Sequence, residues 1–381
     1  MHKLLKMRSL AVISHTEHYY TTDGKVVGWE PTVRELNYLA EIFDLIYHIA
    51  PIHDNKPNRA TAAYKADNII YVPIKPSGGK TLINKIAIIT AMFTNLKIII
   101  HTIQKVEWVH FRAPANIGIY VLPLLSIMKS KKKWVKYAGN WIKKDIPLSY
   151  SLQRWWLKKN ILKSFVTING QWSNQKRHLL SFANPCLTQS ELLNANKIGI
   201  AKQFSGKLKI CFVGRLDENK GIEKILLSLL NIGLTKHIKE INIVGDGLGR
   251  EKCVSLSKKI LLSIVFHGWL SRSELNKIYA KSHVILLPTN SEGFPKVIAE
   301  ACAFGCVPIV TDLPPINQVI TNNLNGILFN IPSIQEITRI IMFLKSNREK
   351  LKKMSLLCLD KAKEFTYSKY LSSINKKILK G

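Results

Sequence analysis

Short apolar runs alternate with longer amphipathic stretches from one end of this chain to the other. The alternation is typical of βα units that build a parallel sheet. The predicted strands are residues 10–14, 45–49, 69–72, 108–111, 164–168, 208–213, 241–244, 264–266, 284–287 and 307–310. Helical patterns fill the gaps, and Pro31 suits the first turn of a helix that runs through Phe43. We therefore expect an α/β fold.

The strand series is interrupted once. The apolar rhythm lapses after Asn184-Pro185 and resumes near Lys207. A chain of 381 residues is long enough for two domains with full cores. We expect two doubly wound halves, in which ligands bind at the carboxyl ends of the strands and a cleft lies between the halves.

The basic charge of the chain favours anionic partners. The sequence contains 56 Lys and Arg against 25 Asp and Glu, a formal net charge of +31. Nucleic acid, an acidic membrane surface and phosphorylated small molecules all fit this charge, as does a Lys-rich background on solvated faces. A hydrophobic content of 46% excludes a disordered polycation.

One segment, Lys129–Phe165, concentrates basic and aromatic residues. It carries 11 Lys or Arg, the single acid Asp145, and four of the eight tryptophans, namely Trp134, Trp141, Trp155 and Trp156. This mixture favours binding to an anionic membrane surface, with the rings at headgroup depth and the ammonium groups on lipid phosphate. The alternatives are single-stranded nucleic acid, a core position for Trp155-Trp156, and a solvated face of lysines.

The chain shows no signal for export or for a membrane span. Its first apolar run is too short for a signal peptide and fits a strand. The longest apolar window, residues 82–100, is interrupted by four Asn and Lys residues. The six cysteines match neither a zinc motif nor a redox motif, which indicates thiols in a reducing compartment. We expect a cytoplasmic protein, peripheral on the inner face of the plasma membrane.

The C-terminal half places cations at predicted strand ends and helix starts. Gly214-Arg215 ends one strand, and Lys220-Gly221 opens the following helix. Arg and Lys beside a helix N-terminus make a site for a diphosphate. In the stretch SEGFPKVIAEA, a turn at Gly293 and Pro295 leads into a helix near Lys296. Backbone N–H groups at that helix start can bind phosphate or a sugar hydroxyl.

Two carboxylates flank this second helix start. Glu292 precedes the helix, and Glu300 lies inside it eight residues later. Because two helical turns span about seven residues, both carboxylates can face the same side. Ionised carboxylates accept strong hydrogen bonds from paired sugar hydroxyls.

The order of these elements resembles the nucleotide-sugar-binding domain of the retaining glycosyltransferases of the GT-B fold, the group-one class (family four). The matching elements are Gly214-Arg215, Lys220-Gly221, Gly245-Asp246-Gly247, His267-Gly268, the Glu292–Glu300 element, and Gly305 with Pro308. The resemblance implies two Rossmann-like domains that face a central cleft. It places an acceptor-side domain at residues 1–190, a nucleotide-sugar-binding domain at 205–360, and a C-terminal helix at 361–381 that returns toward the N-terminal domain.

The resemblance also implies roles for single residues. Arg215 and Lys220 would bind the donor diphosphate, Glu292 would contact the donor sugar, and Glu300 would hold the ribose hydroxyls. The loop at Gly268-Trp269 would face the base. Sugar and phosphate would be cradled by the backbone of Gly293, Phe294, Lys296 and Val297. Pro295 stands where many members have Gly, and it removes one backbone N–H.

The N-terminal half matches the family more loosely. Arg112 occupies a position where the family often has a histidine, and His110 lies two residues earlier on the same strand face. Either side chain can reach the donor, and core packing of His110 is the alternative. Gly28-Trp29-Glu30 resembles the glycine turn that approaches the donor phosphates. Ser14-His15 and Glu17-His18 are acceptor-side candidates.

The resemblance implies a function as well as a fold. We expect transfer of a hexosyl or related sugar, with retention, from a UDP- or GDP-sugar to a hydroxyl of a lipid-linked or envelope polysaccharide acceptor. Arg215 and Lys220 would stabilise the charge of the departing diphosphate. The sequence contains no Asp-x-Asp, and we expect neither a metal nor a cofactor nor a nucleic-acid partner. A GT-B nucleotide-sugar epimerase and, less favoured, a basic nucleic-acid-binding protein are the alternatives.

Overall fold

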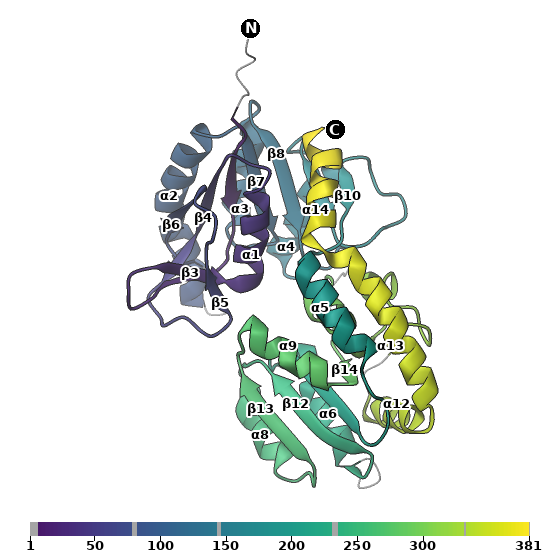
Figure 1. Ribbon diagram of the computed structural model, residues 1–381. Coiled ribbons are helices and arrows are strands. Elements are labelled where there is room, and N and C mark those ends of the chain that lie inside the picture. The colour runs from purple at the N-terminus through teal and green to yellow at the C-terminus, as the bar shows by residue number, and fades with distance from the viewer. Residues whose placement is uncertain (1–6, 78–81, 143–145, 231–234, 331–332, 381) are drawn as a thin grey trace. The chain divides into compact units, whose positions relative to one another are not determined.

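The computed structural model describes residues 7–77, 82–142, 146–230, 235–330 and 333–380. The chain divides into two compact α/β units (Figure 1). Unit 1 comprises Met1–Phe182 and Tyr370–Gly381, and unit 2 comprises Ala183–Lys369. Each unit is built on a sheet of mainly or entirely parallel strands with helices on both faces, so the expected fold class is confirmed.

Unit 1 contains a ten-stranded sheet in the order β10-β9-β8-β7-β1-β4-β2-β3-β5, with β6 paired to β4. All its neighbouring strands are parallel except β2–β3 and β3–β5, which are antiparallel. The strands are β1 (Ser9–Ile13), β2 (His18–Tyr20), β3 (Val26–Trp29), β4 (Leu45–His53), β5 (Thr61–Ala63), β6 (Ile69–Ile74), β7 (Trp108–Ala113), β8 (Lys132–Tyr137), β9 (Phe165–Ile168) and β10 (Leu179–Ser181).

Helices cover both faces of the unit 1 sheet, because side chains alternate along its central strands. On β1, Leu10 and Val12 face one core with Leu36 of α1, while Ala11 and Ile13 face a second core with Val121 of α3. The helices of this unit are α1 (Glu30–Leu39), α2 (Leu82–Gln104), α3 (Gly118–Ile127), α4 (Leu148–Lys159), the part of α14 (Tyr367–Ile374) from Tyr370 onward, and the π-helical turn η3 (Asn375–Leu379).

Unit 2 contains a six-stranded, entirely parallel sheet in the order β13-β12-β11-β14-β15-β16. Its strands are β11 (Leu208–Val213), β12 (Ile238–Val244), β13 (Ser263–Gly268), β14 (Val284–Leu287), β15 (Val307–Thr311) and β16 (Ile327–Phe329). Its helices are α5 (Gln189–Ile200), η1 (Glu218–Lys220), α6 (Ile222–Leu229), α8 (Arg250–Ser257), α9 (Arg272–Lys281), α10 (Lys296–Ala303), α11 (Pro314–Asn317), α12 (Ile334–Ser346), α13 (Arg348–Ala362) and η2 (Lys363–Phe365).

The unit limits differ from the domain limits that we expected. Unit 2 begins at Ala183, whereas the N-terminal domain was expected to end at residue 190. The reason is α5, which contacts α13, α10 and α9 of unit 2. At the other end, the chain re-enters unit 1 at Tyr370. There Tyr370 and Ile374 join the core that Leu36 and Trp108 also enter.

Candidate functional site

The ends of β11 and β14 bring Lys220 and Glu292 together. These two strands are neighbours in the sheet, so the segments that follow their carboxyl ends lie side by side. The ammonium of Lys220 pairs with Oε1 of Glu292. The hydroxyl of Thr289 donates to the same oxygen over 3.2 Å. Both charged side chains are largely buried, which strengthens this pair relative to one in water.

A glycine makes this approach possible. Gly221 has φ = 72°, and a Cβ on it would collide with the carbonyl oxygen of Pro288. A side chain at this position would therefore separate the Lys220 turn from the end of β14. Sequence inspection found Lys220-Gly221 and Glu292 but missed Thr289, whose position after β14 is its only signal.

Arg215 does not join this pair. Its guanidinium forms an ion pair with Asp217 over 3.3 Å, and its side chain is 65% exposed. It lies at the end of β11, as expected, but it contacts its own loop. An exposed pair of this kind contributes little to stability, so the guanidinium can exchange Asp217 for another anion at small cost.

Glu300 is buried in a separate charged cluster. One of its carboxylate oxygens pairs with Arg272, and the other accepts a hydrogen bond from Tyr279 over 3.3 Å. Arg272 also lies 3.5 Å from the carboxylate of Glu191 and donates to the carbonyl of Cys186 over 3.1 Å. Sequence inspection missed Arg272 and Tyr279, which both lie on α9, and Glu191, which lies on α5.

The electrostatics of this cluster favour its charged form. Burial by itself lowers the pKa of Arg272, but the carboxylates of Glu300 and Glu191 outweigh burial and raise it. Burial and the Glu300 carboxylate both raise the pKa of Tyr279, which therefore stays a hydrogen-bond donor. Each Glu300 oxygen can accept two hydrogen bonds, so one acceptor position remains on each after Arg272 and Tyr279 are bound.

The helix start between the two glutamates supplies backbone groups rather than side chains. Helix α10 begins at Lys296 after Pro295, and no side chain caps its first turn. Phe294 is buried and stacks on Phe365, with ring centroids 4.9 Å apart. Gly293, Lys296 and Val297 are partly exposed around this turn. The first-turn N–H groups of α10 are the donors that an anion or a hydroxyl would meet here.

Three glycines join the carboxyl ends of β11, β12 and β13. The N–H of Gly245 donates to the carbonyl of Gly268 over 2.8 Å, and the N–H of Gly214 donates to Val244 over 3.0 Å. Gly245 has φ = 122°, and a Cβ there would collide with the carbonyl oxygen of Gly214. Trp269, directly after Gly268, is partly buried. These backbone hydrogen bonds fix the start of the Gly268-Trp269 loop, which we expected to face the base.

In unit 1, Arg112 and His110 differ in environment. Arg112 donates to Oε1 of the buried Glu35 over 2.8 Å, and Lys136 and Tyr370 donate to the same carboxylate over 2.8 and 2.9 Å. His110 is fully buried and stacks on Trp134 with centroids 3.8 Å apart. Burial, with a smaller effect of Arg112, lowers the pKa of His110 to about 3. His110 therefore has the surroundings of a core residue.

The expected glycine turn at Gly28 is wrong. Gly28 lies inside β3, paired with His18 of the antiparallel strand β2. A Cβ on Gly28 would collide with the His18 imidazole, so packing against this ring requires a glycine here. Packing against His18 is thus one structural reason for a glycine here, and the approach of Gly28 to a donor phosphate stays a prediction.

His18 belongs to a buried hydrogen-bonded chain at the carboxyl ends of β1 and β4. Its Nδ1 donates to the carbonyl of Thr16 over 2.8 Å, so its Nε2 accepts from the hydroxyl of Tyr64 over 2.7 Å. Nδ1 of His48 then donates to the Tyr64 oxygen over 2.6 Å. Nε2 of His48 accepts from the hydroxyl of Ser14 over 2.8 Å. Because the Thr16 carbonyl can only accept, it fixes which atom donates in each of the four hydrogen bonds of this chain when both imidazoles are neutral.

The segment Lys129–Phe165 is not one continuous surface element. Residues 132–137 form the interior strand β8, in which Trp134 is fully buried and Lys133 and Lys136 are also buried. Trp141 is buried as well, and Trp156 donates to Ser126 over 3.0 Å. Lys143, Lys144 and Asp145 lie outside the described residues. The expectation of one continuous interfacial segment along this whole stretch is therefore wrong, and among its described residues the exposed apolar side chains of α4 remain as a candidate surface.

Helix α4 has an exposed apolar row. Leu148, Leu152 and Trp155 are 89%, 46% and 49% exposed, and their spacing of four and three residues puts them on one face. Lys158 and Lys159 at the end of the helix are exposed. Among the described residues, no helix is long and apolar enough to span a bilayer. In the described ranges, no group of three or more His, Cys, Asp or Glu side chains is arranged so that it could hold a metal ion.

The C-terminal part of the chain is similar to a known protein family. Residues 195–356 match the family described as glycosyl transferases group 1. An uncharacterized 41.2 kDa protein in the cps region of Klebsiella pneumoniae is 28% identical over 135 residues, which cover 35% of this chain and 36% of that protein. The lipopolysaccharide 1,6-galactosyltransferase of Escherichia coli is 26% identical over 155 residues, 38% and 40% of the two chains.

These sequence matches span less than half the length of the curated relatives. Solved structures match the whole chain. Anabaena Alr3699/HepE in complex with UDP-glucose aligns over 98% of this chain and 100% of that one, with a TM-score of 0.68 at 13% identity. The chain therefore has the GT-B fold that these glycosyltransferases share.

Proposed function

We propose that this chain is a retaining glycosyltransferase that moves a hexosyl or related sugar from a nucleotide diphosphate-sugar to a hydroxyl of a glycan acceptor. The observation that carries the proposal is the placement of Lys220, Glu292 and the start of α10 at adjacent strand ends of unit 2. This placement lies within the segment that matches the glycosyl transferases group 1. The solved structure of Anabaena Alr3699/HepE contains UDP-glucose, which supports a UDP-sugar as donor.

Each charged group has a distinct part in this proposal. Lys220 has three N–H donors and keeps two for a diphosphate while it contacts Glu292. The first turn of α10 and the exposed guanidinium of Arg215 add positive potential where negative charge develops on the leaving group. Glu292 accepts hydrogen bonds from the transferred sugar, and the remaining acceptor positions of Glu300 take the two ribose hydroxyls.

We propose front-face attack, in which the leaving phosphate removes the proton of the acceptor hydroxyl and no metal or cofactor takes part. The acceptor would be a lipid-linked or envelope polysaccharide, which the lipopolysaccharide 1,6-galactosyltransferase among the relatives supports. The exposed row of α4 would hold the protein on the inner face of an anionic plasma membrane, since apolar side chains beside lysines suit an interface. Nothing in the structure favours the epimerase alternative.

A screen of nucleotide sugars by thermal shift tests the proposal. We expect one or more UDP- or GDP-sugars to raise the melting temperature of the wild-type chain, because a ligand that binds only the folded state stabilises it. Glu300→Ala should abolish the shift. The control is Glu223→Ala, which removes a partly exposed carboxylate paired with Lys252 in the same unit. The proposal fails if no nucleotide sugar shifts the wild type, and the site assignment fails if Glu300→Ala keeps the full shift.

A further inference from the structure

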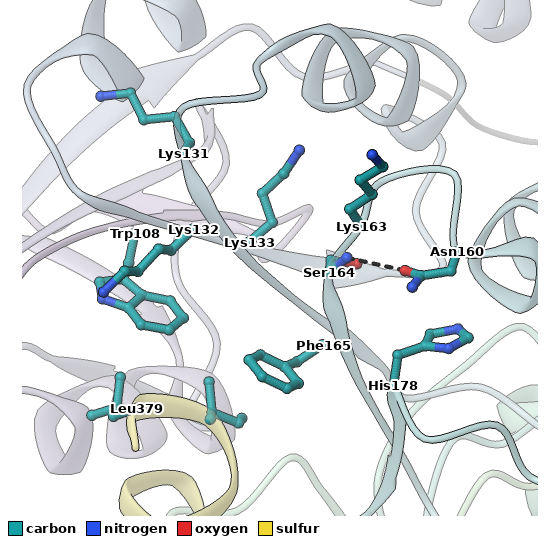
Figure 2. Close-up of a pocket in the computed structure, with 11 residues that line it drawn as sticks. Trp108, Lys131, Lys132, Lys133, Asn160, Lys163, Ser164, Phe165, His178 and Leu379 are labelled. Atoms are coloured by element: carbon teal, nitrogen blue, oxygen red, sulfur yellow. Dashed lines mark hydrogen bonds between the residues drawn. The ribbon is translucent and has the colours of Figure 1, made fainter. Parts of the chain in front are cut away.

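A pocket of about 500 Å³ opens at the amino-terminal edge of the unit 1 sheet (Figure 2). Three adjacent parallel strands, β7, β8 and β9, contribute their first residues to it. Its lining residues are Trp108, Lys131, Lys132, Lys133, Asn160, Lys163, Ser164, Phe165, His178, Ile378 and Leu379. Since the Glu35 cluster and the His18 chain lie toward the carboxyl ends of the strands, this pocket belongs to neither.

The charged residues that line the pocket are basic. Four of the lining residues are lysines, and none of the eleven is acidic. The side chains of Lys133 and Lys163 extend in the same direction from neighbouring segments (Figure 2). Burial lowers the pKa of Lys133, and the charge of Lys163 lowers it further. The ammonium of Lys133 also donates to the carbonyl of Leu125 over 3.0 Å, and an anion beside Lys133 and Lys163 would relieve the repulsion between their charges.

The neutral lining residues add a hydrogen-bond donor without a partner. Ser164 is buried, and within the described part of the chain its hydroxyl meets no hydrogen-bond partner. Its own N–H donates to Oδ1 of Asn160 over 3.0 Å, which closes the loop between α4 and β9. A buried hydroxyl left without a partner is costly, so a ligand oxygen here would satisfy it.

The loop that carries Lys163 has an uncommon backbone. Asn160 and Lys163 both have positive φ values, 57° and 51°. Asn adopts this conformation readily, but Lys does so at a cost that the rest of the loop must offset. The loop therefore holds Lys163 in a strained backbone conformation.

The opposite wall of the pocket is apolar. The rings of Trp108 and Phe165 and the side chain of Leu379 form it (Figure 2). Ile378, which precedes Leu379 in the C-terminal turn η3, also lines the pocket. Lys132 lies over the Trp108 ring at 5.1 Å and pairs with Glu107 over 3.0 Å. A bare inorganic anion would leave this wall uncovered, whereas an amphiphile would cover it.

We propose that this pocket binds a phosphate group carried on an apolar body, with the phosphate on Lys133, Lys163 and Ser164 and the apolar body on Trp108, Phe165 and the C-terminal turn. The ligand is either a lipid in a membrane or a free phosphorylated amphiphile, which share this chemistry. The inference does not depend on the glycosyltransferase proposal, because the pocket lies at the other edge of the sheet and its test measures binding alone.

The test is calorimetric titration of the full chain with dihexanoyl phosphatidic acid, kept monomeric. Lys163→Asn should weaken binding about tenfold, since one charge-assisted hydrogen bond is lost. This variant should fold normally, because Asn suits the left-handed backbone. Ser164→Ala should also weaken binding. The matched control is Lys176→Gln, which removes an exposed unit 1 charge outside the pocket and should bind like the wild type.

Two results would overturn the inference. One is equal affinity of the wild type, Lys163→Asn and Ser164→Ala for the amphiphile. The other is inorganic phosphate binding as tightly as dihexanoyl phosphatidic acid, which would mean that the apolar wall takes no part. Vesicles of phosphatidylcholine with a minority of phosphatidic acid then identify the source. A loss of vesicle binding in Lys163→Asn supports a membrane lipid, and unchanged vesicle binding supports a free amphiphile in the same pocket.

Discussion

Arg272 decides how the Glu300 carboxylate is presented. Its guanidinium bridges Glu300 and Glu191 and donates to the Cys186 carbonyl, so its position is set from three directions. Arg272 binds one carboxylate oxygen of Glu300, and Tyr279 binds the other. Each oxygen therefore keeps one position at which it can accept a further hydrogen bond. This arrangement matches a pair of neighbouring hydroxyls, and we infer that Arg272 acts as a positioning residue for the proposed donor.

Replacing Arg272 tests this inference. We expect Arg272→Gln to weaken UDP binding about tenfold, because a misplaced carboxylate loses part of a charge-assisted hydrogen bond, and we expect Arg272→Lys to restore part of the loss. The measurement is titration with UDP and with 2′,3′-dideoxy-UDP. The dideoxy nucleotide lacks the hydroxyls, so its affinity should change little. An equal loss for both nucleotides would show that Arg272 serves the fold rather than the diol site.

Burial of both imidazoles makes the element formed by β1, β2 and β4 sensitive to acid. Burial is the largest cause that lowers the pKa of His18, from 6.5 to about 4, and burial also lowers that of His48. A histidine whose pKa is lower in the folded state binds more protons when unfolded. Stability is therefore complete above about pH 6.5 and is lost as the pH falls toward 4.

Chemical denaturation at two pH values measures this effect. For His18 alone, the free energy of unfolding should be about 2 kcal/mol lower at about pH 5 than at about pH 7. His18→Gln removes the titrating group and should reduce this difference. The control is His101→Gln, an exposed histidine on α2 that should leave the difference unchanged. The assignment is wrong if His18→Gln and the wild type lose the same stability between the two pH values.

Helix α4 has the exposed row that membrane binding needs. Replacing Leu152 and Trp155 together by Ser should lower binding to anionic vesicles by more than tenfold. Each large apolar side chain that moves from water into the lipid contributes about 1.5–3 kcal/mol to binding. Cosedimentation with vesicles measures the change. Leu193→Ser on α5, an equally exposed leucine of unit 2, is the control. Equal sedimentation of the wild type and the double variant would exclude α4 as the membrane surface.

At the scale of the whole molecule, residues after unit 2 in the sequence pack into unit 1. Tyr370 donates to Glu35 of α1 over 2.9 Å, and this carboxylate also holds Arg112 and Lys136. The ring of Tyr370 packs edge-on against Phe182, with centroids 6.0 Å apart. Unit 1 therefore depends on residues that follow all of unit 2 in the sequence.

Tyr370→Phe should destabilise unit 1 by about 1.5–3 kcal/mol, because a hydrogen bond to a buried carboxylate is lost while the ring stays. Unfolding followed by hydrogen exchange should show faster exchange in β1, β7 and β8 and unchanged exchange in β11 and β14. Tyr367→Phe is the matched control, since Tyr367 lies on the same helix but belongs to unit 2. Equal acceleration in both units would mean that they do not unfold separately.

Sequence inspection predicted β11 and β14 with their observed bounds, and it selected Lys220 and Glu292, which the structure brings together. The strands were predictable because buried parallel strands are continuous apolar runs bounded by turn residues, and the two charged side chains lie in the segments that follow those runs. It missed β8, whose sequence KKWVKY suggests a basic surface. Strand β8 is interior because the ammonium of Lys136 pairs with Glu35 and that of Lys133 donates to the carbonyl of Leu125.

The amino-acid sequence by itself determined the two doubly wound sheets and the charged motif of unit 2, because both depend on patterns that repeat within short windows of chain. Only the tertiary structure decided which partner each charge takes. Arg272 holds Glu300, Tyr370 holds Glu35, and Gly28 makes room for His18. These contacts join side chains that are distant in sequence or lie on different strands, and the cost of leaving a buried charge or polar group unpaired selects them only once the chain has folded.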